Sequence, residues 1–140
     1  MYTSIQQLID EISKNLDAEP PATEDMIREA ESLAGYSFPE DYKSFLMWSN
    51  GSEGQVGGRY VSLWNVGRLR ELNDGYGINL YLPGVLAIGT DGGGQGYALD
   101  FRSSATSPAF IQVPLGDLNF DSITILEDSF FEGMRRALMK

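Results

Sequence analysis

Hydrophobic residues near the start of the chain recur every three or four positions, which is the period of an amphipathic helix. The residues that follow this period are Ile5, Leu8, Ile9, Ile12 and Leu16. Tandem prolines at positions 20 and 21 remove two amide donors and push the residue before them into an extended conformation. We therefore predict a helix that contains the five apolar positions and ends before Glu19.

Two further helices are predicted before residue 51. One begins after Thr23 and ends at Gly35, since glycine readily adopts the left-handed conformation of a helix end. Its expected buried stripe is Met26, Ile27, Ala30, Leu33 and Ala34. The next helix follows Pro39, whose missing amide hydrogen costs nothing in a first turn, and it ends at Asn50-Gly51. Its expected apolar face is Tyr42, Phe45, Leu46 and Met47.

From residue 51 onward, short apolar runs alternate with glycine, asparagine and proline, which is typical of strands and turns. Strands are predicted at 60–66, 85–88, 97–101 and 110–113, with a helical turn at 69–73. The run at 85–88 is continuously apolar, which indicates a strand covered on both faces. At 97–101, large apolar residues alternate with Ala98 and Asp100, so we expect a strand with one buried face there.

The chain closes with a predicted helix and so defines a fold class. Ser129 and Glu132 have the spacing of a capping box. The residues expected to face inward are Phe130, Phe131, Met134 and Leu138. Helices, then strands, then a helix indicate an α+β fold, with N-terminal helices and a C-terminal helix packed on a mainly antiparallel sheet. We expect residues 1–140 to form a single domain.

Composition narrows the function classes. Hydrophobic residues make up 42% of the chain and charged residues 21%, as in ordinary globular proteins. The chain has no cysteine and no histidine, so it lacks thiol nucleophiles and the commonest general base and metal ligand. We therefore expect no enzymatic activity, no catalytic residue, no metal and no cofactor.

The net charge of −10 is distributed unevenly. Residues 1–41 carry ten acids and two bases, whereas residues 42–140 carry ten acids and eight bases. A negative field repels phosphate backbones, so direct nucleic-acid binding is not expected, and it attracts a basic protein surface. The same acid excess is also explained by solubility alone.

Targeting signals are not visible in the sequence. The N-terminus has no basic segment followed by an apolar stretch, so no signal peptide is predicted. No apolar run approaches the length of a membrane span, so no membrane association is predicted either. We expect a soluble, cytoplasmic protein, a location with which the absence of cysteine is compatible.

The glycine-rich run at 91–96, DGGGQG, has two readings. Successive backbone amides could bind an anion, as in phosphate-binding loops, or the run could be a hairpin turn in which glycine supplies positive φ. A phosphate-binding loop needs a lysine near its end and a helix after it, and this run has neither. The spacing favours the hairpin.

Exposed aromatic residues are candidate anchors for a protein partner, because such residues dominate interface energetics. We expect Trp48 to pack in the core, as part of a helix that faces the sheet. For Trp64 and Tyr76, core packing and partner binding are equally supported. Carboxylate pairs carry little information, because 20 acids in 140 residues guarantee many of them.

Three segments resemble a known family. Residues 38–51, FPEDYKSFLMWSNG, are similar to the hallmark block of the SUKH superfamily, which contains the fungal Smi/Knr cell-wall regulators and many bacterial immunity proteins. Residues 88–100, with IGTDGGG followed by YALD, resemble its second block, and residues 129–134, SFFEGM, resemble its terminal helix. The resemblance covers residues 22–138 in the expected order.

Membership of this superfamily would imply an α+β fold and a non-catalytic role. Bacterial members typically neutralise a cognate polymorphic toxin by binding it, and that toxin is often a nuclease. Our leading hypothesis is therefore an immunity-type protein that covers a toxin with an acidic, partly aromatic surface. The alternative is a regulatory scaffold or adaptor of the Smi/Knr type without a toxin partner.

The candidate partner-binding residues lie in segments that we predict to be loops around the helix-and-sheet core, where binding residues concentrate. They combine acidic, amide and aromatic side chains. The set is Glu53, Trp64, Asp74, Tyr76, Asp91, Gln95 and Asp117.

Overall fold

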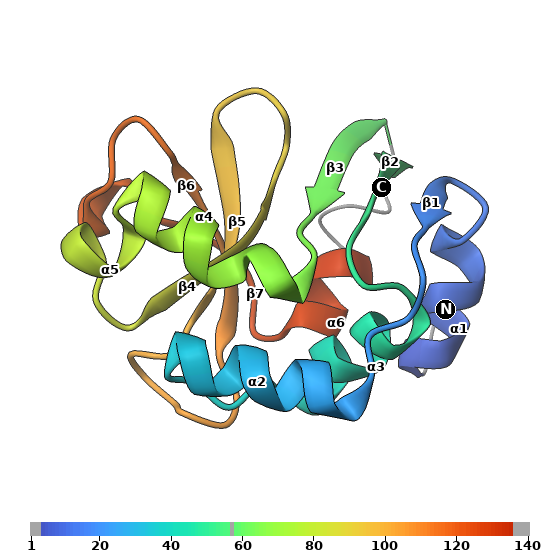
Figure 1. The fold of residues 1–140 in the computed structure, drawn as a ribbon. Helices are drawn as coiled ribbons and strands as arrows, with labels where there is room; N and C mark the ends of the chain where they lie inside the picture. Colours follow the sequence, from blue (N-terminus) through green and yellow to red (C-terminus); the bar gives the residue numbers. More distant parts are fainter. Residues whose placement is uncertain (1–3, 57, 136–140) are drawn as a thin grey trace.

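The computed structural model describes residues 4–56 and 58–135 of the chain. Its α-helices are α1 (Ile5–Ile12), α2 (Glu24–Ala34), α3 (Glu40–Trp48), α4 (Leu69–Tyr76), α5 (Ile78–Tyr81) and α6 (Phe130–Gly133). Its strands are β1 (Leu16–Ala18), β2 (Ser52–Val56), β3 (Arg59–Leu63), β4 (Val85–Thr90), β5 (Gln95–Asp100), β6 (Ala109–Pro114) and β7 (Thr124–Glu127). Short 3-10 helices, η1 (Val66–Arg68) and η2 (Phe120–Ser122), precede α4 and β7 (Figure 1).

The strands within these described ranges form one seven-stranded sheet in the order β1 to β7. Each strand pairs antiparallel with the next strand in the sequence. The predicted α+β class with a mainly antiparallel sheet is therefore confirmed.

One face of the sheet is covered by the N-terminal helices and by α6, as the sequence predicted; Figure 1 shows α2, α3 and α6 grouped together. Aromatic rings join these helices to the strands. The Phe130 ring of α6 lies 5.5 Å from that of Phe45 in α3 and 5.7 Å from that of Phe110 in β6. Burial of such large rings dominates the energetics of a core of this kind.

The opposite face is covered over β4, β5 and β6 by α4 and α5, an arrangement that the sequence analysis missed. A second apolar cluster fills this layer, formed by Ile78, Leu82, Val85, Ala87, Ala98, Ile111 and Val113. Strand β4 is therefore buried on both faces, as predicted. The expectation of one buried face at 97–101 is wrong, because Ala98 packs under α5 and is fully buried.

Among the described residues, the α4–α5 layer does not extend over β2 and β3. In β3, Val61 and Leu63 point into the helical core, whereas Tyr60 and Ser62 point to the other side. Glu53 of β2 pairs with Ser62, and directly opposed residues share a face of the sheet. An open sheet surface therefore lies next to the edge of the α4–α5 layer.

The first helix is shorter than predicted. It ends at Ile12, and Leu16 begins β1, which pairs with Ser52–Gly54 of β2. Leu16 is buried in the strand as it would have been in a helix, so its apolar character could not decide between the two. The hydroxyl of Ser52 donates to the carbonyl oxygen of Asp17 at 2.7 Å and stabilises this edge strand.

Three residues that were predicted to be buried are exposed. Met26 and Leu33 of α2 are 39% and 52% exposed, and Met47 of α3 is 48% exposed. Helix α2 contacts the core mainly through Ile27 and Ala30, so its buried stripe is narrower than predicted. Trp48 packs partly buried against the core, with its ring 5.5 Å from that of Phe45.

The helix boundaries otherwise follow the predicted caps. Thr23 accepts a hydrogen bond from the amide of Met26, and Gly35 ends α2 at φ 84°. Ser129 accepts from the amide of Glu132, as the capping-box spacing predicted. Phe130 and Met134 are buried, whereas Leu138 lies outside the described residues. Among the described helices, none has the length and apolar character that crossing a membrane requires.

Candidate protein-binding groove

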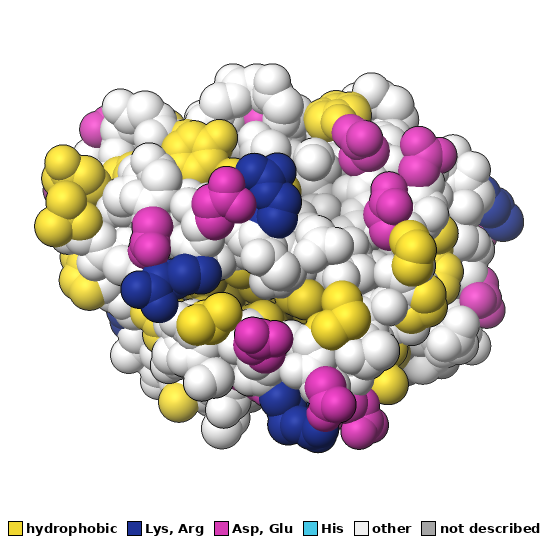
Figure 2. Space-filling model, in the orientation of Figure 1, with side chains coloured by type: hydrophobic (Ala, Val, Ile, Leu, Met, Phe, Trp, Pro, Cys, Tyr) yellow, Lys and Arg dark blue, Asp and Glu magenta, His cyan; other side chains and the backbone are white. Residues whose placement is uncertain are grey.

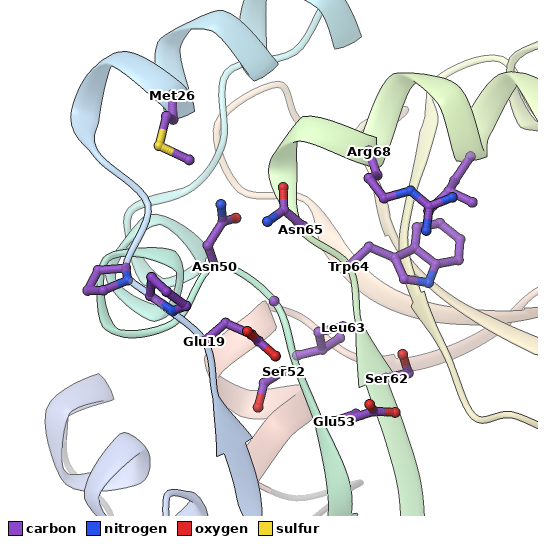
Figure 3. A pocket seen from close by; sticks show the side chains of 14 residues that line it. Glu19, Met26, Asn50, Ser52, Glu53, Ser62, Leu63, Trp64, Asn65 and Arg68 are labelled. Carbon is purple, nitrogen blue, oxygen red and sulfur yellow. The ribbon is translucent and has the colours of Figure 1, made fainter.

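A groove of about 590 Å³ lies on the uncovered face of β2 and β3, beside η1 and α4 (Figure 3). We call it the β3–α4 groove. Its lining comes from segments far apart in the sequence: Glu19, Pro20, Pro21, Met26, Asn50, Gly51, Ser52, Glu53, Ser62, Leu63, Trp64, Asn65, Arg68 and Leu72.

Asn50 joins three of these segments at the floor of the groove. Its side-chain oxygen Oδ1 accepts a hydrogen bond from the amide of Val66 at 2.9 Å, which anchors the start of η1. Its own backbone amide donates to the carbonyl oxygen of Pro20 at 3.2 Å. Only 3% of the residue is exposed, so these bonds hold the floor in a nearly solvent-free environment.

Glycine is required next to Asn50. Gly51 has φ 88°, and a Cβ at this position would lie 2.8 Å from both the Leu63 carbonyl oxygen and the Asn65 amide nitrogen. The hydroxyl of Ser49 adds two bonds, donating to the carbonyl oxygen of Gly51 and accepting from the amide of Glu19 at 2.7 Å. Residues 49–51 therefore hold β2, β3 and the segment before α2 at fixed positions.

One wall of the groove is aromatic. The ring of Trp64 stacks on the ring of Tyr76 in α4, with centroids 6.0 Å apart and planes within 3°. Tyr76 is 42% exposed, and the apolar surface continues over α5 through Leu80 and Tyr81, which are 75% and 58% exposed. Figure 2 shows hydrophobic side chains gathered over α4 and α5 on this face.

The opposite end of the groove is acidic. Figure 3 shows the carboxylates of Glu19 and Glu53 at the end that also carries Ser62. The hydroxyl of Tyr60 donates to the Glu53 carboxylate, and this bond raises the pKa of Tyr60 above its usual value. Arg68 lies on the α4 side, where it pairs with Glu71 at 3.4 Å.

Charges over the whole face follow the same division. In Figure 2, acidic side chains gather over β2 and β3, whereas the surface over α4 carries both signs. Asp74 of α4 pairs with Arg70 at 2.8 Å, and both side chains are exposed. Exposed pairs of this kind contribute little stability, so these groups can change partners at low cost.

The structure brings three of the seven predicted partner-binding residues to the groove, and a fourth lies on the adjoining helix α4. Glu53 and Trp64 line the groove, Tyr76 stacks on Trp64, and Asp74 lies on the same helix as Tyr76. The remaining three residues, Asp91, Gln95 and Asp117, lie in other parts of the molecule.

Asp91 and Gln95 belong to the hairpin between β4 and β5, which confirms the hairpin interpretation of the glycine-rich run. The Asp91 carboxylate accepts from the amides of Gly93 at 2.7 Å and Gln95 at 3.0 Å. The amide of Gly92 donates to the hydroxyl of Thr90. These loop amides are already used within the hairpin, which argues against an anion site.

A smaller cavity of about 240 Å³ lies beside this hairpin, lined by Arg59, Tyr60, Asp91, Tyr97 and Gln112. Burial raises the pKa of the Tyr97 hydroxyl, and the negative charge of Asp91 adds to this effect. Because Tyr60 also bonds Glu53, this cavity and the acidic end of the groove are neighbours.

Asp117 occupies the link between β6 and β7. Its carboxylate accepts from the hydroxyl of Ser122 at 3.0 Å and from the side-chain amide of Asn119 at 2.9 Å. Its position is thus explained by local turn formation. In the described ranges 4–56 and 58–135, no three acidic side chains are grouped so that they could hold a metal ion.

Sequence reasoning missed the residues that build the groove. Asn50-Gly51 and Pro20-Pro21 were interpreted as signals that end helices, and Met26 was assigned to the core. Each of these residues lines the groove. The sequence carries no signal that links these two pairs, because they are far apart along the chain and only the fold brings the Asn50 amide to the carbonyl oxygen of Pro20.

The fold is an α+β domain, and its β3–α4 groove is lined by acidic, amide and aromatic side chains. A sequence model of the SMI1 / KNR4 family (SUKH-1) matches residues 21–136, and the chain belongs to this family. The resemblance drawn from the three sequence blocks is therefore confirmed. A comparison with curated proteins found no match.

The positions of those blocks explain what they do in the fold. The first contains helix α3 and the Asn50-Gly51 floor of the groove. The second forms the β4–β5 hairpin, and the third caps α6 against the sheet. Each block stabilises the fold, and the first also shapes the groove.

Proposed function

We propose that this protein binds a protein toxin and neutralises it by covering its functional surface. The observation that carries the proposal is the stacked pair of Trp64, which is partly buried, and Tyr76, which is 42% exposed, at the wall of a groove that Glu19 and Glu53 also line. Aromatic side chains that are rigid and accessible are the commonest anchors of protein interfaces. Membership of the SUKH-1 family supports an immunity-type role.

The negative net charge of the chain supports the proposal that its partner is basic. A net charge of −10 favours encounter with a positively charged surface and disfavours nucleic acid. A nuclease is a toxin of this kind, because it must itself carry positive charge to bind its substrate. The immunity protein would act without chemistry, by occupying the surface that the substrate needs.

We assign the centre of this interface to Glu53, Trp64, Asp74 and Tyr76. A standard interface takes about 800 Å² from each partner, so it would extend beyond the groove. The hairpin residues Asp91 and Gln95 are neighbours of the acidic end and would lie at the rim. Asp117 would take part only in a larger interface that reaches the β6–β7 link.

The test is calorimetric titration of the purified chain with the toxin encoded beside its gene. We expect binding that Trp64→Ala and Tyr76→Ala each weaken by about ten-fold or more, as hot-spot truncations do. Met47→Ala is the matched control, since Met47 is similarly exposed but lies on α3 outside the groove.

Two results would contradict the proposal. One is the absence of binding at low salt, and the other is an equal loss of affinity in the groove variants and the control. If affinity capture instead recovers several housekeeping proteins and no toxin, the adaptor role of the Smi/Knr type replaces the immunity role.

A further inference from the structure

The β3–α4 groove contains a hydrogen-bond donor for which the described part of the chain supplies no acceptor. Asn50 is 3% exposed and lines the groove, and its Oδ1 accepts from the amide of Val66. Its side-chain nitrogen Nδ2 donates to no acceptor among residues 4–56 and 58–135. Nδ2 is not among the buried atoms that lack a partner, so it reaches the solvent in the groove, where a carbonyl oxygen of a bound chain can take the place of water.

Two ends of different chemistry lie on either side of this donor. Figure 3 shows Glu19 and Glu53 at one end and Met26 at the other, with Asn50 between them. Pro20 and Pro21 also line the groove and add apolar surface to it. The groove therefore offers an anionic site, a central donor and an apolar site in sequence.

We propose that the groove binds an extended segment of the partner in which an arginine and an apolar residue lie two positions apart. This inference rests on the proposed function and names the chemistry that the site recognises. In an extended chain, residues two positions apart point to the same side, so both side chains can enter the groove together. The carbonyl between them then accepts from Nδ2 of Asn50.

The structure favours arginine over lysine at the acidic end. Ser62 pairs with Glu53 in the sheet, Glu53 and Trp64 both line the groove, and Figure 3 shows Ser62 between them, so this part of the groove offers both a carboxylate and an indole. A guanidinium can bond a carboxylate with two parallel N–H groups and stack on an aromatic ring. Arg68 on the α4 side already pairs with Glu71, so the acidic side chains of the groove itself, which would receive the arginine, are Glu19 and Glu53.

The experiment is an NMR titration of the isotope-labelled full chain with a short peptide, acetyl-Gly-Arg-Ser-Leu-Gly-amide. Two signals report directly on the groove: the side-chain NH₂ pair of Asn50 and the indole N–H of Trp64. The Asn50 pair is assigned by its disappearance in Asn50→Asp, which keeps the oxygen that accepts from Val66. We expect both signals to shift and to saturate with the same dissociation constant.

Matched probes and variants isolate the charge contact. We expect the peptide with glutamine in place of arginine to bind about five-fold more weakly, the upper range for one partly exposed ion pair. Glu53→Gln should weaken binding of the arginine peptide by a similar factor. The glutamine can still accept the hydrogen bond from the Tyr60 hydroxyl. Glu29→Gln removes the same charge from an exposed part of α2 outside the groove and should leave binding unchanged.

The inference is overturned if the arginine and glutamine peptides bind equally, if the groove signals do not move, or if Glu29→Gln and Glu53→Gln have equal effects. Its failure is distinguishable from failure of the proposed function. Loss of toxin binding in Trp64→Ala without peptide binding would keep the proposed function and remove this inference. Peptide binding in the groove without a toxin partner would do the reverse.

Discussion

Gly133 shows how a single residue can decide the packing of a helix on the sheet. It lies in α6 directly over the ring of Phe110, and a Cβ at this position would overlap that ring. Phe110 is fully buried and is held by Tyr97 and Phe130 on other sides, so it cannot move away. We expect Gly133→Ala to lower the free energy of unfolding by about 2–3 kcal/mol, as overpacking of a core does.

Urea denaturation measures this change, and Gly75→Ala is the control. Gly75 lies in α4, is exposed, and has no atom within 4 Å of an added Cβ. Alanine is a better helix former than glycine, so we expect Gly75→Ala to raise the free energy of unfolding by up to about 1 kcal/mol. Equal effects of the two substitutions would contradict the steric explanation for Gly133.

Asn73 is the link between helix α4 and the sheet, and it acts at the scale of whole elements. It is 1% exposed, its Nδ2 donates to the carbonyl oxygens of Leu69 and Ala87, and its Oδ1 accepts from the Ala87 amide at 2.9 Å. Asn73→Ala would leave the amide and carbonyl of Ala87 unpaired in the second apolar cluster. We expect a loss of about 1–3 kcal/mol of stability, the cost of buried unsatisfied groups.

Thermal and urea unfolding of Asn73→Ala test this link. Asn79→Ala removes the same side chain from an exposed position of α5 and should change stability by less than about 0.5 kcal/mol. Because α4 carries Tyr76, we also expect Asn73→Ala to weaken partner binding. Unchanged stability in Asn73→Ala would show that α4 is held by its apolar contacts alone.

The end of β5 is stabilised by a charge pair with a defined pH dependence. Burial by itself would raise the pKa of Asp100, but hydrogen bonds from Arg102 outweigh it and hold this pKa below its usual value. Arg102 also lies 4.3 Å above the ring of Phe120 in η2, so the pair joins β5 to the β6–β7 link. A lowered carboxyl pKa adds stability above the pKa of the unfolded state, and that stability is lost as pH falls.

We therefore expect Asp100→Asn to be less stable than the parent chain at pH 7, the difference to shrink as the pH falls below about 3.9, the usual pKa of an aspartate, and to disappear once the pH is below the lowered pKa of the folded state. Unfolding midpoints measured at a series of pH values from 7 downward test this expectation. Glu29→Gln, which removes an exposed carboxylate, provides the comparison. A difference that persists at low pH would mean that the asparagine acts through packing.

The elements that the sequence predicted well are those whose pattern has one physical explanation. The continuously apolar run at 85–88 and the Thr23 and Gly35 caps of α2 are of this type. Strand β2 was missed because its sequence, SEGQV, has little apolar alternation, and its pairing with β1 and β3 determines its conformation. Helix α4 was predicted as a short turn because the buried polar residue Asn73 interrupts its apolar period.

The candidate site was predictable only in part. Glu53 and Trp64 could be singled out by residue type, and the structure places both in one groove. Their proximity, however, depends on strand register, which a single sequence does not reveal. Asn50 has two roles, as a helix-ending signal and as the floor of the groove, and only its hydrogen bond to Val66 shows the second role.

At the scale of the whole molecule, the unequal cover of the sheet produces the β3–α4 groove. The helices α1, α2, α3 and α6 cover one face along its length, whereas α4 and α5 cover only part of the other (Figure 1). The edge of that partial layer meets the open strands β2 and β3 and forms the groove. The rigid sheet fixes the aromatic wall and the acidic end relative to each other, so little conformational order is lost on binding.

The negative charge of the molecule predicts how the rate of association with a partner depends on salt. Residues 1–41 carry ten acids against two bases, and Glu19 extends this charge into the groove. Long-range attraction of this type acts mainly on the association rate, because it is screened once the Debye length falls from about 10 Å at 0.1 M salt to about 3 Å at 1 M. We expect the association rate with a basic toxin to fall by about ten-fold or more over this range while the dissociation rate changes little. Surface plasmon resonance at a series of salt concentrations separates the two rates. A salt effect confined to dissociation would instead locate the charge pairs inside the interface, and Glu53→Gln would then change the dissociation rate.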